Sequence, residues 1–195
     1  MKVFHYTKCN RIYSIFEDGF IATEMKRTLN TTSRKTDYVW LTEKNSYPKT
    51  ALPFFSAFPE TSLTVHQQNK NVFVDLDKIG KTIGYFYRFG FDVEKANIKK
   101  WFNSPQREIA RQNPQWIQME SVANKIGDDV RSFWFSENDL QLENFSLEYF
   151  ENGIWNCVLS DAALSNLLNE QKQIIDKHKE ISYEKCIEFG LPPKQ

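Results

Sequence analysis

Two polar residues in the segment Trp116-Ile117-Gln118-Met119-Glu120 have the types and spacing that catalysis can use. We expect Trp116–Ser121 to be a β-strand, on which side chains two residues apart point to the same face. Gln118 and Glu120 then form a pair, with an amide to orient a reacting group and a carboxylate to stabilise positive charge. A strand whose polar face only meets solvent would carry the same two residues, and the sequence leaves both interpretations open.

A second candidate lies in the opening segment Phe4-His5-Tyr6-Thr7, within a strand that we expect over Lys2–Thr7. Histidine changes charge near neutral pH and serves as an acid, a base or a hydrogen-bonding group in many sites. A helix is predicted over Cys9–Asp18 from its apolar spacing, with Gly19 just past its end. His5 at the start of such a strand is also compatible with a half-buried residue of no chemical role.

Two more strands carry aromatic residues close to polar ones. Tyr38-Val-Trp-Leu-Thr42 has strand composition and follows the polar run Thr28–Asp37, which we expect to be a mobile loop. Gly84–Phe89 is a further predicted strand and contains Arg88, a residue suited to binding phosphate. The plain alternatives are that Trp40 fills the core and that Arg88 pairs with a local Asp.

The order of these segments resembles the ADP-ribosyltransferase-like fold, especially small bacterial and phage members that begin with His-x-Thr, a helix and a Gly. The resemblance covers Lys2–Thr42 and Trp116–Phe135. It implies a split sheet that holds NAD among a first-strand residue, a second-strand residue and a Glu from a later strand. The expected activity is NAD-dependent ADP-ribosyl transfer to a protein, nucleic acid or small molecule, as in a toxin or phage effector.

The resemblance also implies roles for individual residues. Breaking the nicotinamide–ribose bond leaves positive charge on the ribose, which suits a carboxylate, so the catalytic residues would be Glu120 and, for the acceptor, Gln118. The expected NAD-binding residues are His5 on the adenosine side, Thr7 of the same motif, Tyr38, Trp40 and Thr42 near nicotinamide, and Arg88 at the pyrophosphate. The chain departs from the Arg, Ser-Thr-Ser, Glu branch, because neither the first-strand Arg nor the Ser-Thr-Ser is present.

Length and pattern predict the overall organisation. The 195 residues form one α+β domain over 1–195, with a split, mostly antiparallel sheet, flanking helices and a C-terminal helical extension over 160–195. The remaining predicted elements are helices at Val93–Phe102, Pro105–Gln112 and Asp161–Lys179, a strand at Val130–Phe135, and hairpins at Ser62–Val65 with Asn71–Leu76 and at Asn144–Phe150 with Gly153–Leu159.

Composition excludes several classes of function. The 25 basic and 25 acidic residues balance, so no overall charge attracts nucleic acid or membrane. Three scattered cysteines fit reduced thiols in a cytoplasm, and neither a membrane span nor a metal-ligand motif is expected. Gly80-Lys-Thr82 imitates a P-loop, but Asp75 stands where the loop needs Gly. The alternative to an enzyme is a non-enzymatic nucleotide- or partner-binding module, on the same or an unrelated α+β fold.

Overall fold

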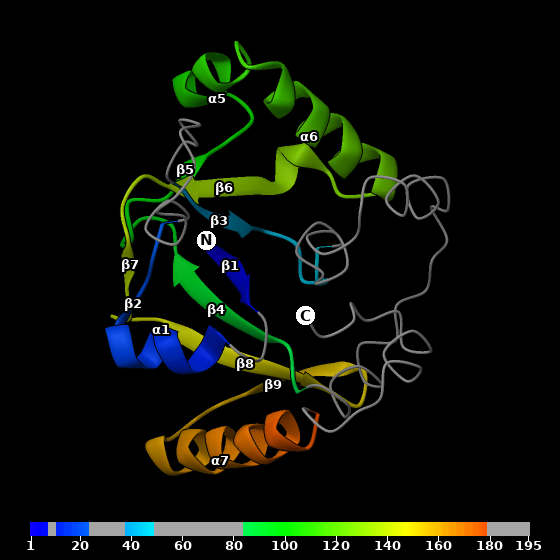
Figure 1. Ribbon diagram of the computed structural model, residues 1–195. Helices are drawn as coiled ribbons and strands as arrows, with labels where there is room; N and C mark the ends of the chain where they lie inside the picture. The colour runs from blue at the N-terminus through cyan, green and yellow to red at the C-terminus, as the bar shows by residue number, and fades with distance from the viewer. Residues whose placement is uncertain (8–10, 24–37, 49–83, 179–195) are drawn as a thin grey trace.

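A seven-stranded sheet forms the centre of the computed structural model, which describes residues 1–7, 11–23, 38–48 and 84–178 (Figure 1). The strands run in the order β5-β6-β3-β1-β4-β8-β9, and every neighbouring pair is antiparallel. Their bounds are β1 Lys2–Thr7, β3 Val39–Thr42, β4 Tyr87–Asp92, β5 Lys99–Lys100, β6 Phe133–Ser136, β8 Ser146–Glu151 and β9 Ile154–Cys157. The coarse expectation of an α+β chain with a mostly antiparallel sheet and a C-terminal helix is confirmed.

The helices lie on both sides of this sheet. In the described part of the chain they are α1 Ile12–Asp18, α5 Pro105–Ala110, α6 Pro114–Ile126 and α7 Asp161–His178, together with the 3₁₀ turn η4 at Val130–Ser132. A small second sheet pairs β2, Phe20–Ile21, with β7, Leu140–Gln141. Figure 1 shows α5 and α6 beside β5 and β6, whereas α1 and α7 lie beside β4, β8 and β9 at the opposite end.

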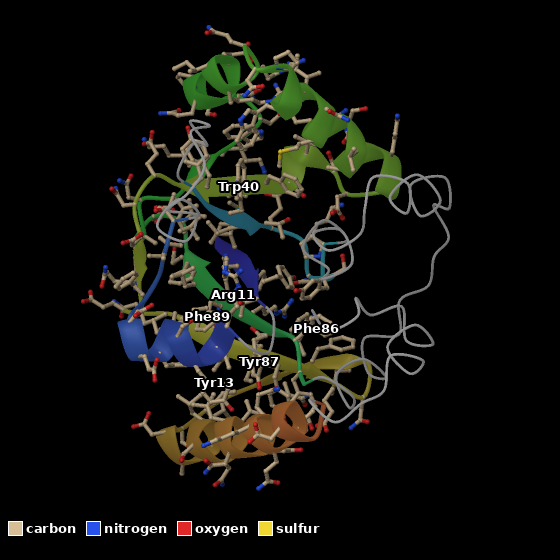
Figure 2. The ribbon with its side chains drawn as sticks, in the orientation of Figure 1. Arg11, Tyr13, Trp40, Phe86, Tyr87 and Phe89 are labelled. Atoms are coloured by element: carbon tan, nitrogen blue, oxygen red, sulfur yellow. The ribbon has the colours of Figure 1, made fainter. Side chains whose placement is uncertain are left out.

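Two hydrophobic cores occupy opposite faces of the sheet. Because side chains alternate along a strand, β3 sends Val39 and Leu41 to one face and Trp40 to the other. The first core packs α1 and α7 against β1, β4 and β8, and includes Tyr87 and Phe89 (Figure 2). The second packs α5 and α6 against β3 and β6 around Trp101. Trp40 is partly buried and packs against this second core, so the interpretation that Trp40 fills the core is correct in part.

Several predicted elements are confirmed with small shifts of their ends. These are the strand Lys2–Thr7, the helix ending before Gly19, the strand at residues 38–42, the helix from Pro105, the hairpin of β8 and β9, and the C-terminal helix. Gly19 adopts a left-handed φ of 74° and its backbone N–H donates to Ile15, as the predicted cap requires. Asn152 and Gly153, with φ of 53° and 80°, form the hairpin turn.

Other predicted elements are wrong. The predicted strand Trp116–Ser121 lies within helix α6. The predicted helix Val93–Phe102 is instead a series of turns followed by the short strand β5, with Asn97 at a φ of 50°. Two strand predictions are correct in part: β4 begins at Tyr87 rather than Gly84, and Val130–Ser132 of the predicted strand Val130–Phe135 is a 3₁₀ turn, after which β6 begins at Phe133. The loop Thr28–Asp37, the hairpin Ser62–Val65 with Asn71–Leu76 and the false P-loop lie outside the described residues.

Candidate functional site

The sheet opens between β1 and β3. Six residue pairs join β1 to β4, whereas a single pair, Phe4 with Thr42, joins β1 to β3. Continued in the same register, Tyr6 would lie opposite Trp40. The ring of His5 intervenes there, because its Nδ1 donates to the carbonyl oxygen of Trp40 at 2.9 Å. A side chain thus replaces a backbone partner, and the two strands separate beyond this point.

The hydrogen bond to Trp40 fixes the tautomer of His5. A carbonyl oxygen only accepts, so Nδ1 carries the proton and Nε2 is left as an acceptor. Burial lowers the pKa of His5 to about 4, with a further contribution from the positive charge of Arg11, against the opposing effect of the Trp40 hydrogen bond. At neutral pH His5 is therefore an uncharged ring whose Nε2 accepts hydrogen bonds.

A cavity of about 310 Å³ lies where the sheet opens. Strands β1 and β3 form one side of it, and α6 with Trp101 and Phe133 forms another. The described residues that line it are Phe4, His5, Tyr6, Trp40, Leu41, Thr42, Pro48, Trp101, Trp116, Met119, Glu120, Ala123 and Phe133. Six of these residues are Phe, Tyr or Trp, and Glu120 supplies a carboxylate. A cavity of this size and lining suits a small planar ligand.

Three tryptophans form the aromatic wall of this cavity. The ring of Trp40 lies 4.8 Å from that of Trp101, centroid to centroid, and the two planes stand at 75°. Trp116 lies 5.7 Å from Trp40 and 5.6 Å from Trp101. Trp101 is fully buried, whereas Trp40 and Trp116 are half-buried. These edge-on and tilted contacts are the favourable arrangements of aromatic pairs, so the wall is packed before any ligand binds.

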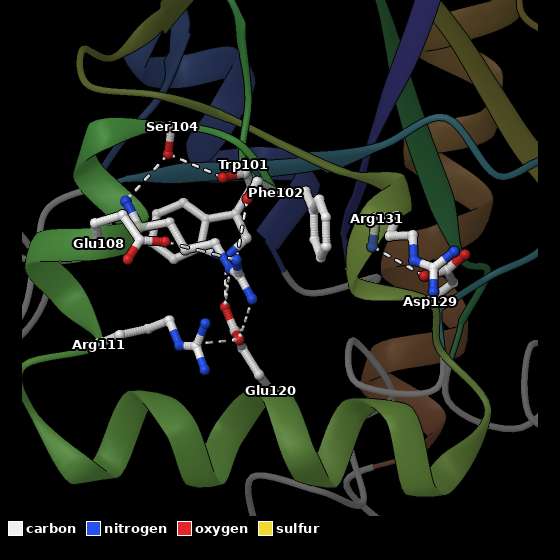
Figure 3. Close-up of polar contacts among 9 residues, drawn as sticks. Trp101, Phe102, Ser104, Glu108, Arg111, Glu120, Asp129 and Arg131 are labelled. Atoms are coloured by element: carbon white, nitrogen blue, oxygen red, sulfur yellow. Dashed lines mark hydrogen bonds and ion pairs between the residues drawn. The ribbon is translucent and has the colours of Figure 1, made fainter.

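Glu120 lies on α6 and has three partners, Trp101, Arg107 and Arg111, whose Nε lies 3.9 Å from Oε2 of Glu120 (Figure 3). Its Oε1 accepts from Nε1 of Trp101 at 2.9 Å and from Nε of Arg107 at 2.8 Å, and its Oε2 accepts from Nη2 of Arg107 at 2.9 Å. Partial burial disfavours the charge, but the hydrogen bonds from Arg107 and Trp101 outweigh it and lower the pKa of Glu120. The carboxylate is therefore charged at neutral pH and anchors one wall of the cavity.

Arg107 reaches Glu120 from the neighbouring helix α5. That helix begins at Ser104, whose hydroxyl oxygen accepts from the backbone N–H of Arg107 at 3.1 Å, and Pro105 occupies its first turn. The guanidinium also donates to the carbonyl oxygen of Phe102 at 3.1 Å and lies 4.6 Å from the centre of that ring. The side chains of Arg107 and Glu120 are 11% and 13% exposed, so their ion pair is largely shielded from water.

The expected pairing of Gln118 with Glu120 is wrong. On a helix, residues two apart are separated by roughly 200° around the axis, so the two side chains point away from each other. Gln118 is exposed and is absent from the lining of the cavity. The correct pattern in this segment is helical, because Trp116, Met119, Glu120 and Ala123 follow the spacing i, i+3, i+4, i+7 and all line the cavity.

The other expected NAD-binding residues fall into two groups. Trp40 and Thr42 line the cavity together with His5 and Glu120. The hydroxyl of Thr42 donates to Oγ of Ser132 at 3.1 Å and accepts from the backbone N–H of Lys44 at 3.2 Å. Tyr38 packs in the second core against Trp40 and Trp101, and Thr7 is buried; neither is among the described residues that line the cavity.

Arg88 lies beside the cavity but does not line it. Its Nε donates to Oε2 of Glu148 at 2.9 Å, its Nη1 donates to the carbonyl oxygen of Asn45 at 2.9 Å, and both members of the ion pair are buried. The guanidinium is stacked between the rings of Phe4, at 4.1 Å, and Trp155, at 4.4 Å. Arg88 is therefore paired with a carboxylate, as the plain alternative held, but the partner is Glu148 from β8 rather than a local Asp, and the guanidinium supports the Phe4 ring from behind.

Some lining residues were missed from the sequence. Trp101 and Phe133 lie in segments for which we expected a helix and a buried strand, and Trp116 and Met119 were assigned to a strand. The helical spacing of Trp116, Glu120 and Ala123 was the available signal. No pattern in the sequence indicated that Arg107 binds Glu120, because the two residues meet only when α5 and α6 pack together.

Neither a metal site nor a membrane span is found in the described part of the chain. Among residues 1–7, 11–23, 38–48 and 84–178, no three His, Cys, Asp or Glu side chains gather closely enough to hold an ion. No helix within those ranges has the length and apolar character needed to cross a bilayer.

Comparisons with protein-family models, with curated proteins and with solved structures find no match to this chain. The geometry and lining of the cavity are therefore the basis for a function.

Proposed function

We propose that this chain binds NAD in the cavity between β1 and β3 and transfers its ADP-ribose group to an acceptor. One observation carries the proposal: His5, Trp40, Thr42 and Glu120, chosen from three separate segments of the sequence, line a single cavity. These segments are far apart in the chain and on different elements. The resemblance takes its Glu from a later strand, whereas Glu120 comes from helix α6, so the support for the proposal is the meeting of these four side chains at one cavity.

The chemistry of the lining supports a nucleotide as ligand. The half-buried rings of Trp40 and Trp116 offer stacking surfaces for nicotinamide or adenine, and the buried ring of Trp101 supports them from behind. Nε2 of His5 accepts hydrogen bonds, which suits a ribose hydroxyl or an amide N–H on the ligand. Glu120 supplies negative charge at the wall, where positive charge on the ribose would be stabilised as the bond to nicotinamide breaks.

The experiment is to incubate the protein with NAD labelled in its nicotinamide ring and to measure released nicotinamide. We expect release by the wild type and a loss of about 10²–10³ in rate for Glu120→Gln, since the charge matters most in the transition state. NAD affinity, measured by calorimetry, should change much less. Glu137→Gln is the control, because Glu137 is a surface carboxylate paired with Lys99 away from the cavity.

A second function, nucleotide binding without catalysis, is favoured by the partners of Glu120. Both carboxylate oxygens already accept hydrogen bonds from Arg107 or Trp101, which leaves fewer lone pairs for a ligand. A binding module would show NAD affinity by calorimetry and no nicotinamide release. If the protein neither binds NAD nor releases nicotinamide, both functions are excluded.

A further inference from the structure

The two strands at the ends of the seven-stranded sheet, β5 and β9, differ in how they are protected (Figure 1). An edge strand presents unpaired backbone groups that can pair with another chain, and proteins block such edges with short strands, lysines or prolines. Strand β5 is blocked in this way. It consists of Lys99 and Lys100, whose side chains form ion pairs with Glu137 and Glu43.

Strand β9 has none of these protections. The segment 152–160 contains neither a charged residue nor a proline. Cys157 is exposed, and Ile154 and Leu159 are 59% and 88% exposed. Among the described residues, no strand lies beyond β9 in the sheet. This end of the sheet is therefore an uncharged and largely apolar edge.

The backbone of β9 directs hydrogen-bonding groups away from the sheet. The N–H of Val158 donates to the carbonyl oxygen of Leu147 on β8 at 2.9 Å. Because backbone groups alternate in direction along an antiparallel strand, those of Asn156 also face β8, whereas those of Trp155 and Cys157 face outward. These outward N–H and C=O groups are the ones that an added strand would use.

We propose that β9 pairs in antiparallel orientation with β9 of a second copy of this chain, so that a two-fold axis joins the two sheets at their edges. Two identical strands related in this way are complementary, because residues at equal distances from the axis lie opposite each other and exchange hydrogen bonds. The pairing is independent of the proposed NAD site.

The distribution of charge favours a second copy as the partner. A two-fold axis places the segment 152–160 against the same segment, and a charged residue there would approach its own copy. The segment contains none, so no like charges meet. The formal net charge of zero also removes overall repulsion between two copies. One pair of short strands buries less area than a standard interface, so the dimer should be weak and reversible.

Sedimentation velocity of the full chain under reducing conditions tests the association. From about 5 to about 500 µM, we expect the wild type to change from monomer to dimer. Cys157→Lys and Leu159→Lys should each raise the dissociation constant of the dimer by at least about 5-fold, because each variant brings two positive charges together near the axis. Ile109→Lys is the matched control, since Ile109 is a 64% exposed apolar residue on α5, and it should associate as the wild type does. A wild type that stays monomeric, or equal dissociation constants for all three variants, would overturn the proposal.

Amide hydrogen exchange of the wild-type protein, followed by NMR, tests the strand pairing itself. On raising the protein concentration, the N–H groups of Trp155 and Cys157 should become protected in proportion to the fraction of dimer. The N–H of Asn156 faces β8 and should exchange at an unchanged rate. A dimer without added protection at Trp155 and Cys157 would show association through another surface. Protection of both at every concentration would show pairing within one chain. Either result would contradict pairing between two copies of β9.

Discussion

His5 shows how one side chain can open a sheet. Its Nδ1 donates a hydrogen bond to the carbonyl oxygen of Trp40, and this bond stands in place of a backbone hydrogen bond between β1 and β3. The same bond orients the ring and determines which nitrogen is free. Opening the sheet and presenting an acceptor to the cavity are therefore two results of one contact.

The lowered pKa of His5 predicts a pH dependence of stability. The unfolded chain binds a proton near pH 6.5, whereas the folded chain resists protonation until about pH 4. Stability should therefore be complete above pH 6.5 and decrease as the pH falls toward 4, by up to about 3 kcal/mol. Urea unfolding of wild type and His5→Gln across this range measures it. The variant should show a flatter profile, and parallel profiles would contradict the assignment.

Glu120 should matter for stability as well as for the site. Glu120→Ala leaves Arg107 without its carboxylate and the indole N–H of Trp101 without an acceptor, so we expect a loss of about 2–4 kcal/mol in unfolding free energy. Because the folded pKa of Glu120 is lowered, this contribution is present above the ordinary carboxyl pKa and is lost as the pH falls through the lowered value.

Glu108→Ala is the control for Glu120→Ala. Glu108 also approaches Arg107, at 3.8 Å, but its side chain is 72% exposed, so its removal should change stability by less than about 0.5 kcal/mol. Equal effects of the two substitutions in chemical denaturation would show that Glu120 does not anchor the wall.

At the scale of elements, the helices, strands and turns that depend on local sequence patterns could be predicted from the sequence. The strand Lys2–Thr7, the Gly19 cap and the hairpin of Asn144–Phe150 with Gly153–Leu159 depend on neighbouring residues, and all three are confirmed with small shifts of their ends. Helix α6 was missed because its aromatic start resembles a strand, although Pro114 and the spacing of Trp116, Glu120 and Ala123 favour a helix. The contact of Arg107 with Glu120 joins two helices, and no local pattern contains it.

Strand β4 contains a glycine in a crowded position. A Cβ at Gly90 would lie 2.5 Å from Oγ of Ser146 and 3.1 Å from Cε1 of Phe4, whose ring carries Arg88 on one face. Gly90→Ala should therefore cost about 1–3 kcal/mol, mainly through the contact with Ser146. Thermal unfolding measures this loss. Ser146→Gly in the same variant should restore most of the lost stability, and a double variant as unstable as Gly90→Ala would place the clash at Phe4 instead.

At the scale of the whole molecule, the two hydrophobic cores on opposite faces of the sheet differ in how closely they adjoin the cavity. The core under α1 and α7 meets the cavity lining at Leu41, whereas the core under α5 and α6 shares Trp40, Trp101, Trp116, Ala123 and Phe133 with it. Leu167 on α7 belongs to the first core, so the C-terminal helix is packed against the sheet in the part that the structure describes. Substitutions in α7 should act on stability, and those at the lining positions of α6 should also act on ligand binding.

Gln171 connects α7 to the sheet. Its Oε1 accepts from the backbone N–H of Tyr85 at 2.8 Å and from the hydroxyl of Tyr87 at 3.0 Å, and its side chain is fully buried. Gln171→Ala removes the acceptor of two buried donors, so the free energy of unfolding should fall by about 2–4 kcal/mol. Chemical denaturation measures this loss. Lys172→Ala, an exposed neighbour, should stay near wild type, and a Gln171→Ala protein of unchanged stability would contradict the connection.

The most direct test of the central claim is to locate NAD by the indole N–H resonances of the five tryptophans in a nitrogen-15 NMR spectrum. The signals can be assigned by replacing each tryptophan in turn. Titration with NAD should shift the signals of Trp40, Trp101 and Trp116, which line the cavity, and leave that of Trp134, which lies outside its lining. A titration that shifts none of the three, or that shifts only Trp134, would contradict an NAD site between β1 and β3.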